Sequence, residues 1–195
     1  MPEPGRFTHL SLENWRNFTK VQITLGQRVF VVGSNAAGKS NLLDAFRFLH
    51  DIAVPGGGLR RALEESRQGL KHVRSLHARR GPARVRIGAL IDGSQWSYEL
   101  AVSRDPKKKS ASSVIVQEIV TCDGRKLINR PNDRDNADEL LLTQTYLEQN
   151  SQNQKFRPLA EFLASVQYTH VVPQLVRNTS PDDRKRFGEA LGADF

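Results

Sequence analysis

The sequence predicts a mixed α/β (α+β) domain in which a phosphate-binding loop joins a strand to a helix and an antiparallel β-meander follows. Three patterns predict this fold class. An apolar run at residues 28–32 leads into two glycines with the spacing of a phosphate-binding loop, and a helical apolar pattern follows at residues 39–50. Alternating segments separated by Asp-Gly pairs then fill residues 84–128. These patterns are typical of a strand–loop–helix unit followed by hairpins.

Composition restricts the compartment and the chemistry. Of the 195 residues, 38% are hydrophobic and 26% are charged, which is typical of a globular protein. No apolar run reaches the roughly 18 residues that a membrane span needs, and residues 1–6 lack the apolar centre of a secretion signal. Cys122 is the only cysteine, which excludes a disulfide or a cysteine-based zinc site within one chain. We therefore expect a cytoplasmic protein with no membrane partner.

The N-terminal elements follow from hydrophobic periodicity. Apolar and polar residues alternate over Phe7–Leu12 and Val21–Leu25, which predicts two half-buried strands with a turn at residues 14–18. The continuous apolar run Val29–Val32 predicts a central strand that is buried on both faces. Apolar residues at helical spacing over 39–50 predict an amphipathic helix.

The later elements are shorter and more polar. Asp92-Gly93 and Asp123-Gly124 predict tight hairpin turns. In chain order the expected elements are a polar helix over 59–79, strands over 84–91, 96–102, 114–120 and 125–128, a mobile polar loop over 129–138, helices over 139–147 and 159–166, a strand over 168–172, and a helix that starts at Ser180.

Positive charge is concentrated in the middle of the chain. Residues 51–110 carry 13 basic and 6 acidic side chains, a net charge of +7, whereas the whole chain has a net charge of +8. A basic face suggests a polyanion such as DNA as a partner. The alternative is a solvated surface that keeps the protein soluble.

One motif points directly to a ligand. Residues 33–40 read Gly-Ser-Asn-Ala-Ala-Gly-Lys-Ser and fit G-x-x-x-x-G-K-[ST], the phosphate-binding loop. We expect Gly33 and Gly38 to adopt backbone angles that curl the loop around a phosphate, with Ala36 and Ala37 keeping it tight. Loop N–H groups and the positive end of the next helix would bind the anion. Lys39 would reach the β- and γ-phosphates, and the Ser40 hydroxyl would bind Mg²⁺.

The surroundings of this motif resemble a known family. Leu12–Phe18 (LENWRNF), the loop, and Lys39–Leu49 (KSNLLDAFRFL) together look like the head of ABC-type P-loop ATPases of the RecF and structural-maintenance-of-chromosomes group. Within this group they are most similar to the AAA-type "predicted ATPase" branch, which includes overcoming-lysogenization-defect (OLD) ATPases and anti-phage systems. The likeness covers residues 7–50 well and residues 56–103 more loosely. It implies an ATP- and Mg²⁺-binding head lobe.

The resemblance implies roles for further residues. Arg16 would lie near the base or ribose of the nucleotide, although an ordinary turn arginine is the alternative. Asn35 would lie near the γ-phosphate, and Asn41 would support the loop. Gln174 would touch Mg²⁺ and the attacking water, with a loop glutamine as the alternative. The expected nucleotide-binding residues are Arg16, Gly33, Ser34, Asn35, Ala36, Ala37, Gly38, Lys39, Ser40 and Asn41; Lys39 and Gln174 are the expected catalytic residues, and Ser40 and Gln174 the expected metal ligands.

The family also has parts that residues 1–195 do not show. These are an apolar strand ending in Asp-Glu and a serine-glycine signature; in residues 138–142 the two acids precede the apolar run. We therefore expect the N-terminal lobe of a longer or split ATPase, with sections 1–52, 53–130 and 131–195. Alone it would bind ATP with little or no hydrolysis, and the full-length protein would form a head-to-head homodimer.

Two functional hypotheses follow. The first is part of an ATP-driven machine that is associated with DNA or with phage defence. The second is a non-catalytic nucleotide-sensing or scaffold module, or an inactive truncated fragment.

Overall fold

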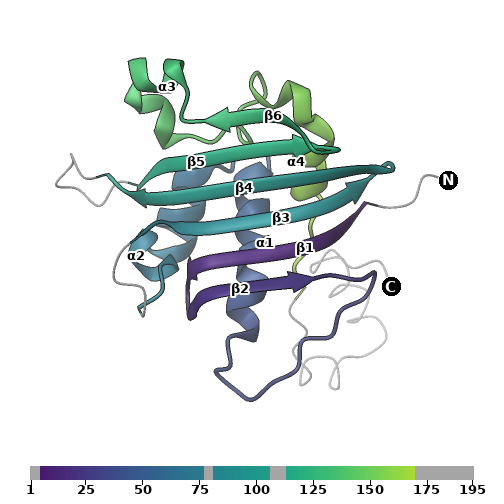
Figure 1. The fold of residues 1–195 in the computed structure, drawn as a ribbon. Helices are drawn as coiled ribbons and strands as arrows, with labels where there is room; N and C mark the ends of the chain where they lie inside the picture. The colour runs from purple at the N-terminus through teal and green to yellow at the C-terminus, as the bar shows by residue number, and fades with distance from the viewer. Residues whose placement is uncertain (1–4, 77–80, 106–112, 170–195) are drawn as a thin grey trace, which may run out of the picture.

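Alternating apolar and polar residues produce one antiparallel sheet in the computed structural model, which describes residues 5–76, 81–105 and 113–169 (Figure 1). The strand order within this part is β2-β1-β3-β4-β5-β6. The strands are β1 (Arg6–Trp15), β2 (Phe18–Thr24), β3 (Ala83–Ile91), β4 (Ser94–Arg104), β5 (Ser113–Cys122) and β6 (Arg125–Arg130). The predicted mixed α/β class with an antiparallel meander is confirmed.

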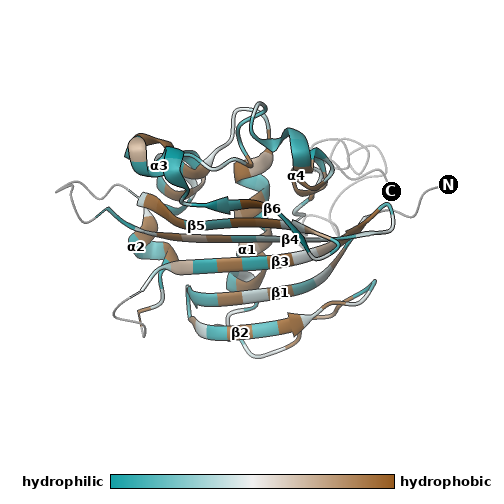
Figure 2. Cartoon of the chain, turned by 45° about the horizontal axis from the view of Figure 1, so that its top comes forward, coloured by the Kyte–Doolittle hydropathy of each residue, from teal (hydrophilic) through white to brown (hydrophobic). Residues whose placement is uncertain are grey.

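The sheet buries one face against helices. Leu10 of β1 pairs with Ile87 of β3, and both side chains are buried on the same face. Helices α1 (Lys39–Ala53) and α4 (Arg157–Ala164) lie behind this face in Figure 1. Figure 2 shows the alternation of apolar and polar residues along the strands that makes one face the core. None of the helices in the described ranges has the length and apolar character needed to span a membrane.

The two Asp-Gly turns form as predicted. Asp92 and Gly93 have φ of 48° and 78°, and Asp123 and Gly124 have φ of 48° and 77°. Two successive positive φ values are what a two-residue hairpin loop requires, and Asp and Gly tolerate them better than most residues. Cys122 ends β5 beside the second turn and packs against the core, as expected of a strand-end residue.

The polar helix predicted over 59–79 is interrupted. The structure has a π-helical segment η1 (Arg61–Glu65) and a separate short α2 (Leu70–Val73). Gln68 and Gly69 lie between them with φ of 58° and 97°, which no α-helix allows.

The central strand predicted at Val29–Val32 is wrong for this structure. The segment has no strand conformation, and Phe30 and Val32 are 80% and 88% exposed. The physical reason is pairing: none of the six strands in the described part lies beside this segment to take its backbone hydrogen bonds. The run has the composition of a buried strand without a neighbour to bury it.

The mobile loop predicted at residues 129–138 is also wrong. Strand β6 continues to Arg130, and α3 (Asp133–Ala137) follows after Asn132, whose side chain accepts hydrogen bonds from the N–H groups of Arg134 and Asp135. The predicted helix over 139–147 is instead a 3₁₀ turn, η2 (Glu139–Thr143), and a second one, η3 (Asn153–Phe156), precedes α4. The polar residues of this stretch are ordered by one another.

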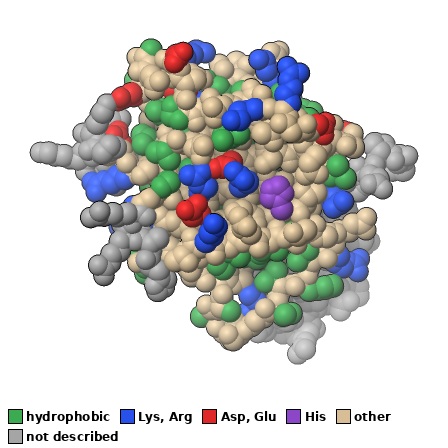
Figure 3. Space-filling view, in the orientation of Figure 1, with side chains coloured by type: hydrophobic (Ala, Val, Ile, Leu, Met, Phe, Trp, Pro, Cys, Tyr) green, Lys and Arg blue, Asp and Glu red, His purple; other side chains and the backbone are tan. Residues whose placement is uncertain are grey.

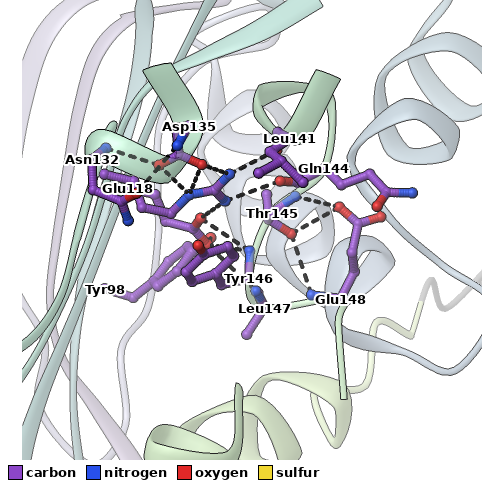
Figure 4. A network of polar contacts seen from close by, with 11 residues as sticks. Tyr98, Glu118, Asn132, Asp135, Leu141, Gln144, Thr145, Tyr146, Leu147 and Glu148 are labelled. Carbon is purple, nitrogen blue, oxygen red and sulfur yellow. Dashed lines mark hydrogen bonds and ion pairs between the residues drawn. The ribbon is translucent and has the colours of Figure 1, made fainter. Parts of the chain in front are cut away.

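A buried guanidinium holds this part of the chain to the sheet (Figure 4). Arg130 and Asp135 are 1% and 0% exposed. The Arg130 Nη1 and Nη2 atoms lie 2.8 Å and 2.7 Å from carboxylate oxygens of Glu118 and Asp135. Its remaining N–H groups donate to the carbonyls of Leu141 and Gln144 and again to Asp135. All the donors of the guanidinium thus have acceptors, as a buried charge requires.

The two acids of this cluster respond differently to burial. Burial raises the pKa of Glu118, and hydrogen bonds from the Tyr146 N–H and Arg130 only partly oppose the rise. For Asp135, burial also acts upward, but the hydrogen bonds from Arg130 and the Asn132 N–H outweigh it and lower its pKa. The hydroxyl of Tyr98 donates to Glu118 at 3.0 Å, so a buried phenol helps to hold the less favourably placed carboxylate.

Candidate nucleotide-binding site

The phosphate-loop motif leads directly into a helix. Helix α1 starts at Lys39, and its N-cap Gly38 has φ of 97°. In the described structure, no side chain caps this end of α1, and the first turn of the helix contains no acidic residue. The first N–H groups of a helix lack intrahelical partners and carry partial positive charge. This end of α1 is therefore suited to an anion.

The curl of the loop comes from different residues than expected. Gly38 has the predicted left-handed conformation, but Gly33 does not; Ala36 adopts it instead, with φ of 63°. The loop turns at Asn35–Ala36, where the N–H of Ala37 donates to the carbonyl of Ser34 at 3.3 Å. The expected role of Gly33 in the curl is thus wrong, because the chain reverses after it rather than at it.

Lys39 lies across the loop. Its Nζ donates to the carbonyls of Gly33 at 2.7 Å and Ser34 at 2.8 Å. An ammonium has three N–H groups, so one remains for a ligand beside the loop. The loop is at the surface, with Ser34, Asn35 and Ser40 exposed. The arrangement places a cation and a helix N-terminus together at an accessible position.

The turn between β1 and β2 packs against the first two turns of α1. The indole N–H of Trp15 donates to the carbonyl of Asn41 at 3.2 Å. Asn41 in turn donates from Nδ2 to Oδ1 of Asn17 at 3.0 Å. Arg16 binds the Asp44 carboxylate at 2.8 Å and 3.1 Å. The structure thus brings Arg16 and Asn41 to the same end of α1 as the loop.

Arg16 is engaged within the protein. Besides Asp44, its Nη1 donates to the carbonyl of His72 at 2.9 Å. Asp44 is shared with Arg67, whose side chain is 2% exposed and also pairs with Asp51 at 2.8 Å. The sequence prediction counted Arg67 among the basic residues of 51–110 that would form a charged surface. The signal that it missed is the pair of acids seven residues apart on one face of α1, which can accept a buried arginine.

The outer face of the sheet carries charges of both signs. Figure 3 shows Lys/Arg and Asp/Glu side chains next to one another near its centre. Arg84 and Arg86 of β3 both pair with Glu99 of β4. Three further arginines of residues 51–110 also pair with acids: Arg60 with Glu64, Arg61 with Glu65, and Arg67 with Asp44 and Asp51. Much of the positive charge in the described part of this region is therefore balanced within the chain.

A large groove lies apart from the phosphate-binding loop. This groove of about 760 Å³ runs between β1, residues 29–32, α1 and α4, with Phe7, Phe30 and Phe46 in its lining. No residue of 33–41 lines it. The groove is apolar, whereas the loop is a polar surface feature, so the two are separate.

Gln174 and the predicted strand beyond Thr169 lie outside the described residues. Their expected roles stay predictions. Within the described residues, no group of three or more His, Cys, Asp or Glu side chains could hold a metal ion. The Ser40 hydroxyl, exposed at the second position of α1, is a suitable oxygen ligand for Mg²⁺ beside a bound phosphate.

The sequence is similar to known proteins. The family described as "AAA domain, putative AbiEii toxin, Type IV TA system" matches residues 28–190. The DNA replication and repair protein RecF of Rhizobium meliloti (strain 1021) is 31% identical over 115 residues, which are 57% of this chain and 27% of that protein. The RecF protein of Mesorhizobium japonicum is 41% identical over 96 residues, 47% of this chain and 24% of that protein. The chain thus spans about a quarter of the length of these relatives.

Further similarities are shorter or weaker. Endonuclease GajA of Bacillus cereus (strain VD045) is 41% identical over 49 residues, 25% of this chain and 8% of that protein. A structure of the recombination mediator protein RecF-ATPrS in the RecFOR pathway has a TM-score of 0.45 and 19% identity, covering 97% of this chain and 38% of that chain. A structure from work on ATP-driven dimerization and DNA-stimulated activation of SMC ATPases has a TM-score of 0.46 and 16% identity. It covers 94% of this chain and 97% of that chain.

Proposed function

The chain belongs to the AAA-domain family described as "putative AbiEii toxin, Type IV TA system", and from this premise we propose that residues 33–40 bind the phosphates of ATP. The observation that carries the proposal is the junction of the loop with α1. There Lys39 lies across the loop at 2.7 Å and 2.8 Å from two of its carbonyls, beside a helix end with no side-chain cap. Binding, rather than turnover, is the activity that the described residues support.

The surrounding residues have secondary roles in this proposal. Asn35 is exposed at the tip of the loop and would contact the γ-phosphate. Arg16 would approach the base or ribose, which requires it to share its guanidinium between Asp44 and the nucleotide. Gln174 would contact Mg²⁺ and the attacking water. In a longer protein, ATP would then drive head-to-head dimerisation of two such lobes.

Mg²⁺ binding gives the first test. When bound, Mg²⁺ neutralises charge on the β- and γ-phosphates, and the Ser40 hydroxyl would be its protein ligand. Ser40→Ala should weaken binding of Mg-ATP about tenfold, as expected for the loss of one metal contact, and leave binding of ATP in EDTA unchanged. Isothermal titration calorimetry with and without EDTA measures both. Equal weakening under the two conditions would show that Ser40 does not act through the metal.

DNA contact is the second part of the proposal. Ala83 of β3 pairs with Val102 of β4, so the chain segments that flank this hairpin leave the same end of the sheet. Those segments contain five basic residues whose placement the structure does not describe: Arg79, Arg80, Lys107, Lys108 and Lys109. Five positive charges in two segments joined to one hairpin would suit a phosphate backbone.

Salt dependence tests this contact. Lys107→Ala/Lys108→Ala should weaken binding to a duplex oligonucleotide and reduce the slope of log K against log salt by about 2, because each phosphate contact contributes about 1. Fluorescence anisotropy over a salt series measures the slope. The matched control is Arg125→Ala/Lys126→Ala, which removes two charges at the opposite end of the sheet. Equal changes in both variants would assign the effect to net charge alone.

A further inference from the structure

The end of β1 and the turn that follows it have an uncommon backbone conformation beside the phosphate-binding loop. Asn14 and Arg16 have φ of 53° and 52°, which few non-glycine residues adopt. The N–H of Arg16 donates to the carbonyl of Val73 at 2.6 Å, and Asn14 Nδ2 donates to the carbonyls of Gly81 and Pro82 at 2.9 Å and 3.2 Å. Such conformations persist where neighbouring contacts fix them, and they cluster at functional sites. The turn is therefore a pre-shaped element with a defined position relative to α1.

Asn17 is the residue through which this turn reaches the loop. Its Oδ1 accepts the hydrogen bond from Asn41 Nδ2 at 3.0 Å, and its own Nδ2 lies 3.5 Å from the carbonyl oxygen of Ala37. A Cβ added to Gly38 would lie 2.3 Å from this Nδ2. The amide of Asn17 thus fills the space over Gly38 and contacts the chain on both sides of it.

These contacts lie where the proposed ligand would bind. Residues 37–41 contain the end of the loop and the first N–H groups of α1, which the proposed function assigns to phosphate. Asparagine has a donor and an acceptor on one planar group, so it can bind a carbonyl and an amide together. Alanine could do neither, and aspartate would place a negative charge beside the phosphates.

We propose that Asn17 is a positioning residue of the phosphate-binding loop, an inference that rests on the proposed function. Asn17 bridges Ala37 and Asn41 across Gly38 and orders the N–H groups before a nucleotide arrives. A binding site that is ordered in advance loses less conformational entropy on binding. Its neighbour Arg16 forms an ion pair with Asp44, further along α1. The two residues therefore contact the helix at separate points.

The effect of Asn17 on nucleotide binding can be measured separately from its effect on stability. Asn17 is exposed and makes its contacts at the surface, so its loss should change the loop rather than the core. Asn17→Ala should weaken ATP binding about fivefold, the effect of one hydrogen bond of ordinary strength, and leave the urea midpoint of unfolding unchanged. Asn41→Ala should weaken binding by a similar or smaller factor, and the double variant should bind no more weakly than Asn17→Ala alone, because Asn17→Ala already breaks the contact with Asn41. Thr19→Ala, an exposed residue of the same hairpin, is the matched control.

A second variant pair uses the space over Gly38. Gly38→Ala should greatly weaken ATP binding, because the new Cβ meets the Asn17 amide and the backbone φ is 97°. Adding Asn17→Ala removes the amide and should recover at least about threefold in affinity, although the same substitution alone lowers it. A substitution that weakens binding in one background and strengthens it in the other indicates direct contact.

The outcomes separate the two proposals. Titration calorimetry of the whole chain with Mg-ATP gives the affinities, and urea unfolding gives the stabilities. An Asn17→Ala variant that binds ATP as tightly as wild type overturns the positioning role while the proposed function stands. A variant with unchanged affinity and a lowered unfolding midpoint overturns it as well, since Asn17 would then serve only stability. A wild-type chain that fails to bind ATP overturns the proposed function and this inference with it.

Discussion

Replacing Arg130 with methionine should lower the free energy of unfolding by about 3–5 kcal/mol, the cost of removing one partner from a buried ion pair. The substitution leaves the carboxylates of Glu118 and Asp135, both fully buried, without their cation. It also removes the hydrogen bonds that Arg130 donates to the carbonyls of Leu141 and Gln144. Urea denaturation followed by circular dichroism measures the loss.

Two further variants show whether burial of charge is the cause. Arg134→Met removes an exposed arginine four residues away on α3 and should change stability by no more than about 0.5 kcal/mol. The triple variant Arg130→Met/Glu118→Gln/Asp135→Asn removes all three charges and should recover part of the loss, because no unpaired charge then stays buried. If Arg130→Met costs no more than Arg134→Met, the cluster does not hold residues 130–147 to the sheet.

The larger functional effect is expected at Lys39. Lys39→Ala should weaken ATP binding at least about 100-fold, or ~2.7 kcal/mol, because it removes the only side-chain cation of the loop and its charge-assisted hydrogen bonds to phosphate. Lys39 contacts loop carbonyls at the surface rather than the core, so the fold should be retained. The variant therefore distinguishes an effect on ATP binding from an effect on folding.

Local patterns predicted the parts of the fold that depend on local interactions. The Asp-Gly turns and the alternation over β3 to β6 specify hairpins by themselves, because each strand pairs with its sequence neighbour. Helix α1 was predicted for the same reason, since its apolar stripe and its start after Gly38 lie within one stretch of sequence. The motif predicted the backbone conformation of its first four residues less well, as the unexpected φ of Ala36 shows.

The predictions that failed depend on partners that a local pattern does not contain. Val29–Val32 has the composition of a buried strand, but burial requires a neighbouring strand, and none of the described strands lies beside it. Residues 129–138 are polar and suggested a solvated loop, whereas Arg130 and Asp135 neutralise each other inside the protein. The spacing of Asn132 and Asp135 was a usable signal, because it is the spacing of a capping box that starts a helix.

The candidate site shows the same division. The motif identified residues 33–40 from sequence, and the structure adds the contacts that hold them. Asn17 had no individual signal, because its role arises from the approach of the β1–β2 turn to α1. For Arg67 the usable signal lay on its partners Asp44 and Asp51 rather than on the arginine itself.

The measurement that tests the central claim most directly is a calorimetric titration of the 195-residue chain with Mg-ATP, alongside Lys39→Ala and the control Lys155→Ala. Lys155 is an exposed lysine of η3 on a different element from the loop. If residues 33–40 bind the phosphates of ATP, wild type and Lys155→Ala should both show saturable binding. Lys39→Ala should show none. Equal affinity of wild type and Lys39→Ala would contradict the central claim.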